Sequence, residues 1–392
     1  MPEPGVIGIP SPSLVVILGA AGAGPLALCS KELTGEPIAS SPEAIEARLR
    51  ARRLAVFDAR ALASGTRRAV AALARRHHLP AVALVFHAGD NAAAGIDAEE
   101  FAIIHRVRVA PAAGEPRLRT VPLPCDREAE CGPFDVIGDV HGCAAELDRI
   151  LLHLGYRRSS SRSPFLHPAG RLAVFVGDLV DRGPAVLDAA QRVMDMVESG
   201  TGLCVAGNHD DDLARTLQGD GPAPGPGTER SMRQIAAAPP AARRAFTHRF
   251  IRFVGSLPSH LMLDGGRLAV THAAMRADYL GRDSDTVRQF ALRGPRSGVI
   301  DRYGLAARVN WATTYDGATF VVCGHTPVRR PERIGNTLNI DTGCVFGGAL
   351  SALRYPEMDL FSVPAGRAYY QSPRILPSGV GIRAATRITP RD

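Results

Sequence analysis

Short runs of apolar residues recur along the chain and form two separate series. The first series contains residues 14–18, 54–57 and 81–86, and residues 66–78 between the last two have helical spacing. Strands that alternate with helices are typical of a parallel sheet. We therefore predict a small α/β domain with a parallel sheet in the first part of the chain.

The second series follows a segment without periodicity, residues 109–132, which is rich in proline and charge. Its strand-like runs end at Gly138, Gly177 and Gly207, and a helical pattern follows each of them. This arrangement indicates a linker and then a second α/β domain. The predicted organisation is a first domain at 1–108, a linker at 109–132, a second domain at 133–372 and a tail at 373–392.

Composition adds little to this picture. Residues 14–28 are apolar, but glycine and proline interrupt them and no positive charge precedes them, so they predict a buried strand and a loop, not a signal peptide or a membrane span. The seven cysteines are scattered without a CxxC pair, which is typical of a reducing compartment. We expect a cytoplasmic protein without a membrane partner, and the oligomeric state stays open.

Polar segments follow three of the predicted strands in the second domain, and two histidine segments lie downstream. They are GDVHG (138–142), GDLVDRG (177–183), GNHD (207–210), VTHA (270–273) and CGHT (323–326). Carboxylates and imidazoles are natural ligands of divalent transition metals, and two such ions about 3.5–4 Å apart activate water and neutralise phosphoryl oxygens. Each segment alone could be a turn, a helix cap or a satisfied core residue. The ordered set predicts a two-metal phosphoesterase.

This set resembles the calcineurin-like metallophosphoesterase superfamily, in the branch that includes protein serine/threonine phosphatases. The resemblance implies an αββα sandwich for the second domain and two bound divalent ions, Mn²⁺ above all, with Ni²⁺, Fe²⁺ or Zn²⁺ as alternatives. It implies one ligand set for the first metal, a bridging carboxylate and one ligand set for the second. These are, in order, Asp139 and His141; Asp178; and Asn208, His272 and His325.

The same resemblance implies three catalytic residues. His209 would protonate the leaving oxygen as general acid, Asp181 would orient His209, and Arg182 would clamp the phosphate. These roles also make chemical sense by themselves, because a leaving alkoxide needs a proton donor and a phosphate suits a bidentate cation.

Longer stretches of the second domain resemble the phosphatase domain of bacterial polynucleotide kinase-phosphatase, an RNA end-healing enzyme. They include FDVIGDVHGC, GNHDDDL, NIDTGCVFGG and ALRYPEMDLFSVPA. The resemblance implies that the substrate is either a phosphorylated RNA end or a nucleotide. From an RNA end, the enzyme would remove terminal 2′/3′ or 2′,3′-cyclic phosphates. The resemblance also implies that Asp341 lies near the active site. A diadenosine tetraphosphate hydrolase and a serine/threonine protein phosphatase share the metal site and stay open as alternatives.

The first domain resembles the kinase domain of the same family in a degenerate form. Its glycine-rich turn at residues 19–26 has the layout of a P-loop, but Pro25 and Leu26 replace the lysine and the hydroxyl residue that phosphates and Mg²⁺ need. Pro42 stands where the kinase would have its catalytic aspartate. We predict a domain without phosphoryl transfer, or else a module that binds nucleic acid or a partner. The family's RNA ligase domain is not expected in this chain, so a separate ligase is a partner to consider.

Overall fold

The computed structural model contains two compact units. It describes residues 6–19, 24–34, 38–87, 101–108, 117–160, 163–300, 306–371 and 386–387. Unit 1 comprises Met1–Asp126 and Gly281–Val287, and unit 2 comprises Arg127–Leu280 and Arg288–Asp392.

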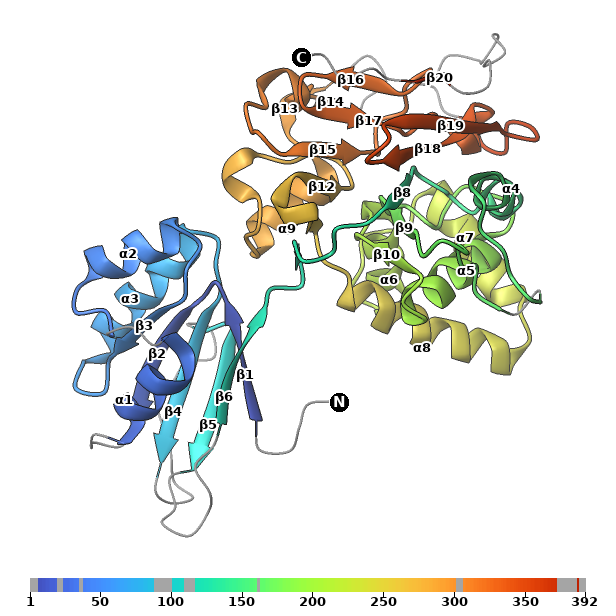
Figure 1. Ribbon diagram of the computed structural model, residues 1–392. Coiled ribbons are helices and arrows are strands. Elements are labelled where there is room, and N and C mark those ends of the chain that lie inside the picture. The colour runs from blue at the N-terminus through green and yellow to red at the C-terminus, as the bar shows by residue number, and fades with distance from the viewer. Residues whose placement is uncertain are drawn as a thin grey trace. The chain divides into compact units, whose positions relative to one another are not determined.

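Unit 1 is built around a four-stranded sheet in which every pairing is parallel (Figure 1). Its strands, in spatial order, are β3 (Ala55–Asp58), β2 (Leu14–Gly19), β4 (Ala81–His87) and β5 (Ile103–Arg108). The helices α2 (Pro42–Arg50) and α3 (Ser64–Arg76) pack together and against this sheet. The predicted parallel sheet is therefore confirmed.

The predicted P-loop falls largely outside the described residues. Strand β2 ends at Gly19, residues 20–23 are not described, and α1 (Gly24–Cys29) leads into the π-helical turn η1 (Ser30–Thr34). A strand and a helix therefore flank this segment, and its own conformation lies outside the described residues.

The predicted linker differs from the structure. Strand β6 (Arg117–Pro122) lies within residues 109–132 and pairs in parallel with β1 (Val6–Ser11). The side chains of Leu118 and Ile9 are buried together in the apolar core of unit 1. The segment that was predicted as a linker therefore contributes a strand to unit 1.

Unit 2 contains two mixed sheets, each with six strands among the described residues. The first has the order β10 (Gly202–Cys204), β9 (Leu172–Phe175), β8 (Phe134–Ile137), β18 (Ala349–Tyr355), β19 (Asp359–Pro364) and β20 (Thr386–Arg387). The second has the order β16 (Glu332–Ile334), β17 (Thr337–Asn339), β15 (Phe320–Cys323), β12 (Leu268–Thr271), β11 (His260–Leu263) and β7 (Asp126–Arg127). One apolar cluster contains Val136 and Val174 from the first sheet and Val270 and Val322 from the second, so the sheets pack face to face.

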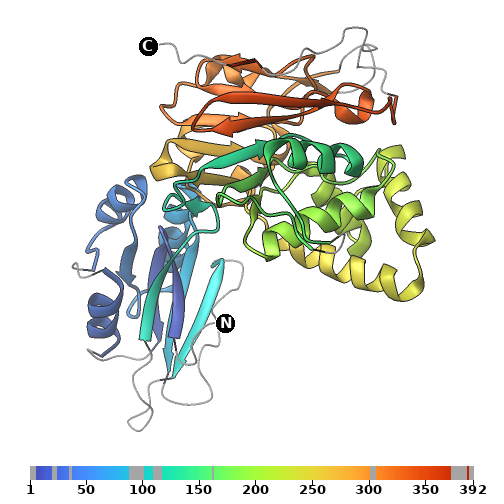
Figure 2. The ribbon, with the colours of Figure 1, turned by 45° about the vertical axis from the view of Figure 1, so that its right-hand side comes forward.

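Helices connect and flank these strands. They are α4 (Ala144–Leu154), α5 (Val186–Glu198), α6 (Asn208–Gln218), α7 (Pro226–Ala237), α8 (Pro240–Ser256) and α9 (Asp285–Arg293). Both ribbon views show α6, α7 and α8 gathered on one side of the strands of unit 2 (Figures 1 and 2). In the part of the chain that the structure describes, no helix combines the length and the apolarity that a bilayer crossing requires.

Parallel pairing brings the polar segments of unit 2 to shared sheet edges. Strands β8, β9 and β10 are parallel neighbours, and the GDVHG, GDLVDRG and GNHD segments follow their carboxyl ends. Strands β12 and β15 of the other sheet are also parallel, and His272 and His325 follow their carboxyl ends. Such edges are where open α/β sheets place their ligands.

A buried ion-pair network at β8 provides a test of this fold. Asp135 is fully buried and lies 2.8 Å from Arg354 Nε and 3.4 Å from Arg171 Nε. We expect Asp135→Ala to lower the free energy of unfolding of unit 2 by about 3–5 kcal/mol, because it removes the carboxylate that pairs with Arg354 and leaves Arg171 with Glu357 alone. Urea unfolding followed by fluorescence of Trp311, the only tryptophan, measures this.

The matched control removes an exposed pair. Arg276 and Asp278 form a salt bridge whose side chains are 54% and 60% exposed. Asp278→Ala should therefore change the same free energy by no more than about 0.5 kcal/mol. Equal effects of the two substitutions would contradict the importance of the buried network.

Candidate active site

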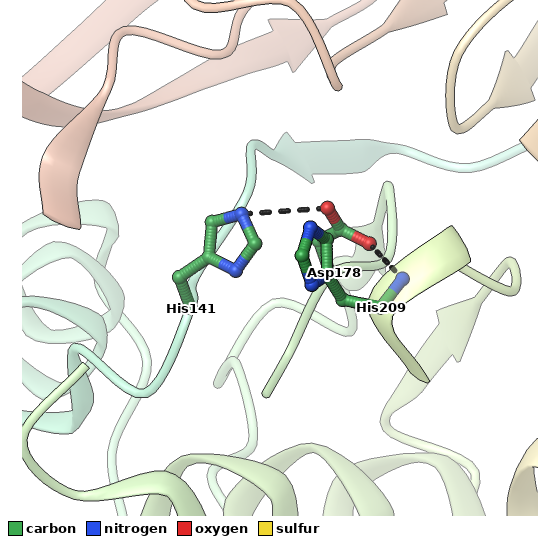
Figure 3. A group of neighbouring side chains, drawn as sticks. All are labelled: His141, Asp178 and His209. Atoms are coloured by element: carbon green, nitrogen blue, oxygen red, sulfur yellow. Dashed lines mark hydrogen bonds and ion pairs between the residues drawn. The ribbon is translucent and has the colours of Figure 1, made fainter. Parts of the chain in front are cut away.

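Asp178 lies at the centre of the clustered polar side chains. Its Oδ2 is 3.3 Å from His141 Nε2, and its Oδ1 is 3.4 Å from His272 Nε2. The backbone N–H of His209 donates to the same Oδ1 at 2.9 Å, as Figure 3 shows. Asp178 belongs to two groups that could each hold a metal ion, one with His141 and His209 and one with His272 and His325. A carboxylate shared by two such groups has the position that a bridging ligand requires.

Three donor atoms converge in the second of these groups. His272 Nε2 lies 3.0 Å from His325 Nδ1 and 3.1 Å from Asn208 Oδ1. His272 is fully buried, and Asn208 is 8% exposed. Two imidazole nitrogens and an amide oxygen directed at one another form a donor set that suits a transition metal ion.

Backbone carbonyls orient two of the imidazoles. Nδ1 of His141 lies 2.7 Å from the carbonyl oxygen of Val180, and Nδ1 of His272 lies 2.9 Å from that of Val176. A carbonyl only accepts, so Nδ1 carries the hydrogen and Nε2 presents its lone pair to the site. Burial and the neighbouring charge of Arg182 hold the pKa of His141 well below its ordinary value, which keeps the imidazole in its neutral, metal-binding form.

Buried carboxylates give the site an excess of negative charge. Asp139 accepts the backbone N–H of His325 at 3.0 Å, and burial together with the charges of Asp341 and Asp178 raises its pKa well above the ordinary value. Asp341 is 4% exposed and accepts the backbone N–H of Gly343 at 3.0 Å. Burial and Asp210 raise the pKa of Asp178 in the same direction. Carboxylates in this arrangement need a cation to stay charged, and divalent ions fit that need.

The loops that carry these side chains have unusual backbone conformations. Five residues of the site have left-handed φ angles: His141 (42°), Asp178 (50°), Asp181 (70°), Arg182 (67°) and His325 (69°). Each conformation costs an L-residue of the order of 1 kcal/mol or more, and such residues cluster at functional sites. Gly183 and Gly324 allow the close approach, because a Cβ on them would collide with the carbonyl oxygen of His141 and with Oδ1 of Asp139.

Arg182, His209 and Asp181 form a second arrangement beside the carboxylates. Nδ1 of His209 lies 2.7 Å from Oδ2 of the buried Asp181. The Arg182 guanidinium lies 2.7 Å from His141 Nε2 and 2.6 Å from His209 Nε2, and it stacks 5.4 Å from the ring of Phe346. A guanidinium only donates, so both Nε2 atoms are unprotonated in this state. The positive charge of Arg182 is thus held between His141 and His209.

Several residues that support this arrangement were not predicted from the sequence. Asp210 accepts the backbone N–H groups of Leu179, Val180 and Gly207, and burial raises its pKa to about 7. Thr228 and Ser231 of α7 donate to Asp181 at 2.7 and 2.6 Å. Asp210 follows His209 directly in the GNHD motif and could have been found there. The two hydroxyl residues carry no motif.

All ten residues that were predicted for the site lie in unit 2, and the contacts above connect them. They are Asp139, His141, Asp178, Asp181, Arg182, Asn208, His209, His272, His325 and Asp341. The roles assigned to them by resemblance stay predictions.

Two packed sheets with aspartate and histidine donors at their strand ends define a metal-dependent phosphoesterase. Residues 132–329 match the calcineurin-like phosphoesterase family. The chain therefore belongs to this family and is a hydrolase that acts on phosphate esters. Membership implies divalent metal ions, and the histidine and aspartate groups of the site fit them.

Relatives whose names state an activity match the C-terminal part of the chain. Bis(5′-nucleosyl)-tetraphosphatase PrpE [asymmetrical] of Geobacillus sp. (strain WCH70) is 42% identical over 236 residues, which cover 60% of this chain and 96% of that protein. The protein of the same name from Geobacillus thermodenitrificans (strain NG80-2) is 42% identical over 232 residues, 59% of this chain and 94% of that protein. Among solved structures, a Saccharomyces cerevisiae protein serine/threonine phosphatase with similarity to human PP5 has 14% identity and a TM-score of 0.42, covering 64% of this chain and 85% of that chain.

Metal content tests the predicted ligand set. We expect about two divalent ions per chain after loading with Mn²⁺ and dialysis, and loss of both in Asp178→Ala, because this carboxylate is common to both donor groups. His272→Ala should retain about one. Elemental analysis measures these ratios, and His248→Ala, which changes an exposed histidine of α8, serves as control. Full metal content in Asp178→Ala would contradict the bridging role.

Proposed function

We propose that this chain is a metal-dependent hydrolase of bis(5′-nucleosyl) tetraphosphates. The observation that carries the proposal is the 42% identity to PrpE over 236 residues, which cover 96% of that protein. This is one of the alternatives that the sequence left open. Removal of phosphates from RNA ends, which rests on the resemblance to polynucleotide kinase-phosphatase, is the second candidate and is compatible with the same site.

Six residues would hold the metals in this proposal. Asp139 and His141 would bind the first ion and Asp178 would bridge to the second, which the remaining three would complete: Asn208, His272 and His325. When bound, the ions supply an activated water and neutralise charge on the phosphoryl oxygens. The neutral state of His141 and the inward direction of its Nε2 and that of His272 support these assignments.

Arg182 and His209 would act on the substrate itself. Arg182 Nη2 and His209 Nε2 lie 2.6 Å apart, and a phosphoryl group placed between them would accept hydrogen bonds from both. For this, His209 takes a proton at Nε2 and passes it to the leaving oxygen. Asp181 stabilises the imidazolium through Nδ1, at 2.7 Å. The Arg182 guanidinium would bind two oxygens of the phosphate, and its stacking on the ring of Phe346 would align it.

A basic depression beside the loop that carries Arg182 supports a substrate with several phosphates. It is lined by Pro184, Arg230, Arg233, Gln234 and Ala237. The Gln234 side chain donates to the carbonyl oxygen of Gly183 at 2.9 Å, which ties the depression to the loop that carries Arg182. Two guanidinium groups one helical turn apart offer sites for phosphates that the metals do not hold.

Product analysis tests the proposed reaction. The Mn²⁺-loaded protein should split diadenosine tetraphosphate into ATP and AMP, the asymmetric products, and Asp178→Ala and His209→Ala should each slow this by about 100-fold or more. Chromatography of the nucleotides measures both. An RNA oligonucleotide with a 2′,3′-cyclic phosphate end is assayed in parallel. Faster turnover of the RNA end than of the dinucleotide would overturn the proposal in favour of the second candidate.

The basic depression predicts a separate effect on binding. Arg230→Gln with Arg233→Gln should raise KM for diadenosine tetraphosphate about tenfold or more and leave kcat/KM for bis(p-nitrophenyl) phosphate within about twofold, because only the longer substrate carries additional phosphates. Arg243→Gln with Arg244→Gln, a matched pair on α8, should change neither value. Equal losses on both substrates would show that the two arginines do not bind additional phosphates.

For unit 1 we propose the degenerate kinase-like domain that its sequence suggests. Strand β2 precedes the glycine-rich segment and helix α1 follows it, and Pro25 and Leu26 replace the residues that would contact Mg²⁺ and the outer phosphates in a P-loop. The proposal includes no phosphoryl transfer by this unit. It leaves open a role in binding nucleic acid or a partner such as an RNA ligase.

A further inference from the structure

The carboxylate of Asp181 is held by hydroxyl groups on both oxygens. Ser231 Oγ donates to Oδ1 at 2.6 Å, and Thr228 Oγ1 donates to Oδ2 at 2.7 Å, the oxygen that also contacts His209 Nδ1. Ser231 Oγ in turn accepts the backbone N–H of Asp181 at 3.0 Å. Asp181 and Ser231 are fully buried and Thr228 is 8% exposed. The plane of the carboxylate is therefore fixed by contacts that water does not supply.

Both hydroxyl residues come from one face of α7. They are three residues apart, so they lie on adjacent turns of the same side of the helix, and the helix begins directly beside the loop of Asp181. The backbone N–H of Arg182 points to the carbonyl oxygen of Gly227 at 3.5 Å, and an added Cβ on Gly227 would lie 3.1 Å from Cγ of Arg182. This helix thus contacts the loop at both Asp181 and Arg182.

The direction of the Asp181 carboxylate decides which nitrogen of His209 can act. When Asp181 Oδ2 faces His209 Nδ1, it accepts the hydrogen of Nδ1. Nε2 is then the nitrogen that can exchange a proton with the substrate. Without the hydroxyls, the buried carboxylate would lose two of its three side-chain donors and could rotate away from the imidazole. The rate of proton transfer from His209 would fall, whereas the donor groups around Asp178 would stay unchanged.

We propose that Thr228 and Ser231 are positioning residues that hold Asp181, and through it His209, in the orientation needed to protonate the leaving oxygen. This inference rests on the proposed role of His209 as general acid. It assigns α7 a catalytic purpose: the helix sets how strongly the reaction depends on the basicity of the leaving group.

A leaving-group series tests the inference. The Mn²⁺-loaded wild-type protein and the variants Thr228→Val and Ser231→Ala are assayed on aryl phosphates from p-nitrophenyl phosphate to phenyl phosphate. Nitrophenolate leaves without help, whereas a more basic phenolate needs a proton. We expect each variant to retain p-nitrophenyl phosphate turnover within about threefold and to lose about tenfold or more on phenyl phosphate.

Conservative variants and a direct control make the result decisive. Thr228→Ser keeps the hydroxyl and should keep the wild-type dependence on the leaving group, and Thr247→Val on α8 is a matched control. Metal content and Trp311 fluorescence verify the site and the fold of each variant. A uniform loss across the series in Thr228→Val and Ser231→Ala, with His209→Asn showing the steep dependence, would overturn the positioning role alone. If the rate of His209→Asn depended on the leaving group no more steeply than that of the wild type, His209 would not be the general acid. Both the proposed role of His209 and this inference would then be wrong.

Discussion

The site depends on keeping several carboxylates charged in a place where water is excluded. Asp139 and Asp178 are 4% and 1% exposed, and neighbouring carboxylates add to the effect of burial: Asp341 and Asp178 raise the pKa of Asp139, and Asp210 raises that of Asp178. Such a group of like charges opposes folding unless a cation or a dense set of hydrogen bonds compensates it. Three features compensate this charge: backbone N–H donors, neutral histidines whose lone pairs face the carboxylates, and a donor set that suits divalent ions. The chemistry that the family performs follows from this unbalanced charge.

The fold supplies the rigidity that this arrangement requires. Parallel strands from two sheets end at the same place, and the apolar cluster between the sheets fixes their ends in position. Residues with left-handed φ angles stand directly after several of these strands, where each costs stability that the packed core offsets. Asp210 adds to this support, because its buried carboxylate joins the GDLVDRG loop to the GNHD loop through three backbone N–H groups. The fold itself therefore holds the predicted ligands in place.

The sequence predicted those parts of the molecule whose signals are local. Each metal-ligand motif directly follows an apolar strand, so both the residues and their place at the strand ends could be inferred from pattern alone. Helix α7 could not, since its first turn lies in a run of proline and glycine (GDGPAPGPG) that favours a loop, and the contacts of Thr228 and Ser231 to Asp181 span 47 and 50 residues. Strand β6 was hidden for a similar reason, because its proline-rich surroundings lack alternation and its partner β1 is more than 100 positions away. Contacts of this length are set by the packed fold, and a single sequence contains no direct signal for them.

Substrate choice is the property on which the site residues give the least information, and the geometry explains why. In the proposed mechanism the metals, Arg182 and His209 would all act on one phosphoryl group, and such a group is common to RNA ends, phosphoproteins and dinucleoside polyphosphates. Identical ligand motifs are therefore compatible with every activity that the sequence left open. Selectivity must come from side chains that reach beyond the reacting phosphate, and α7 is well placed to supply them. Its buried face holds Asp181, whereas its opposite face presents Arg230 and Arg233 next to the same loop. Because one helix carries both sets of contacts, a change in its packing would alter substrate binding and proton transfer together, which links the specificity of this enzyme to its chemistry.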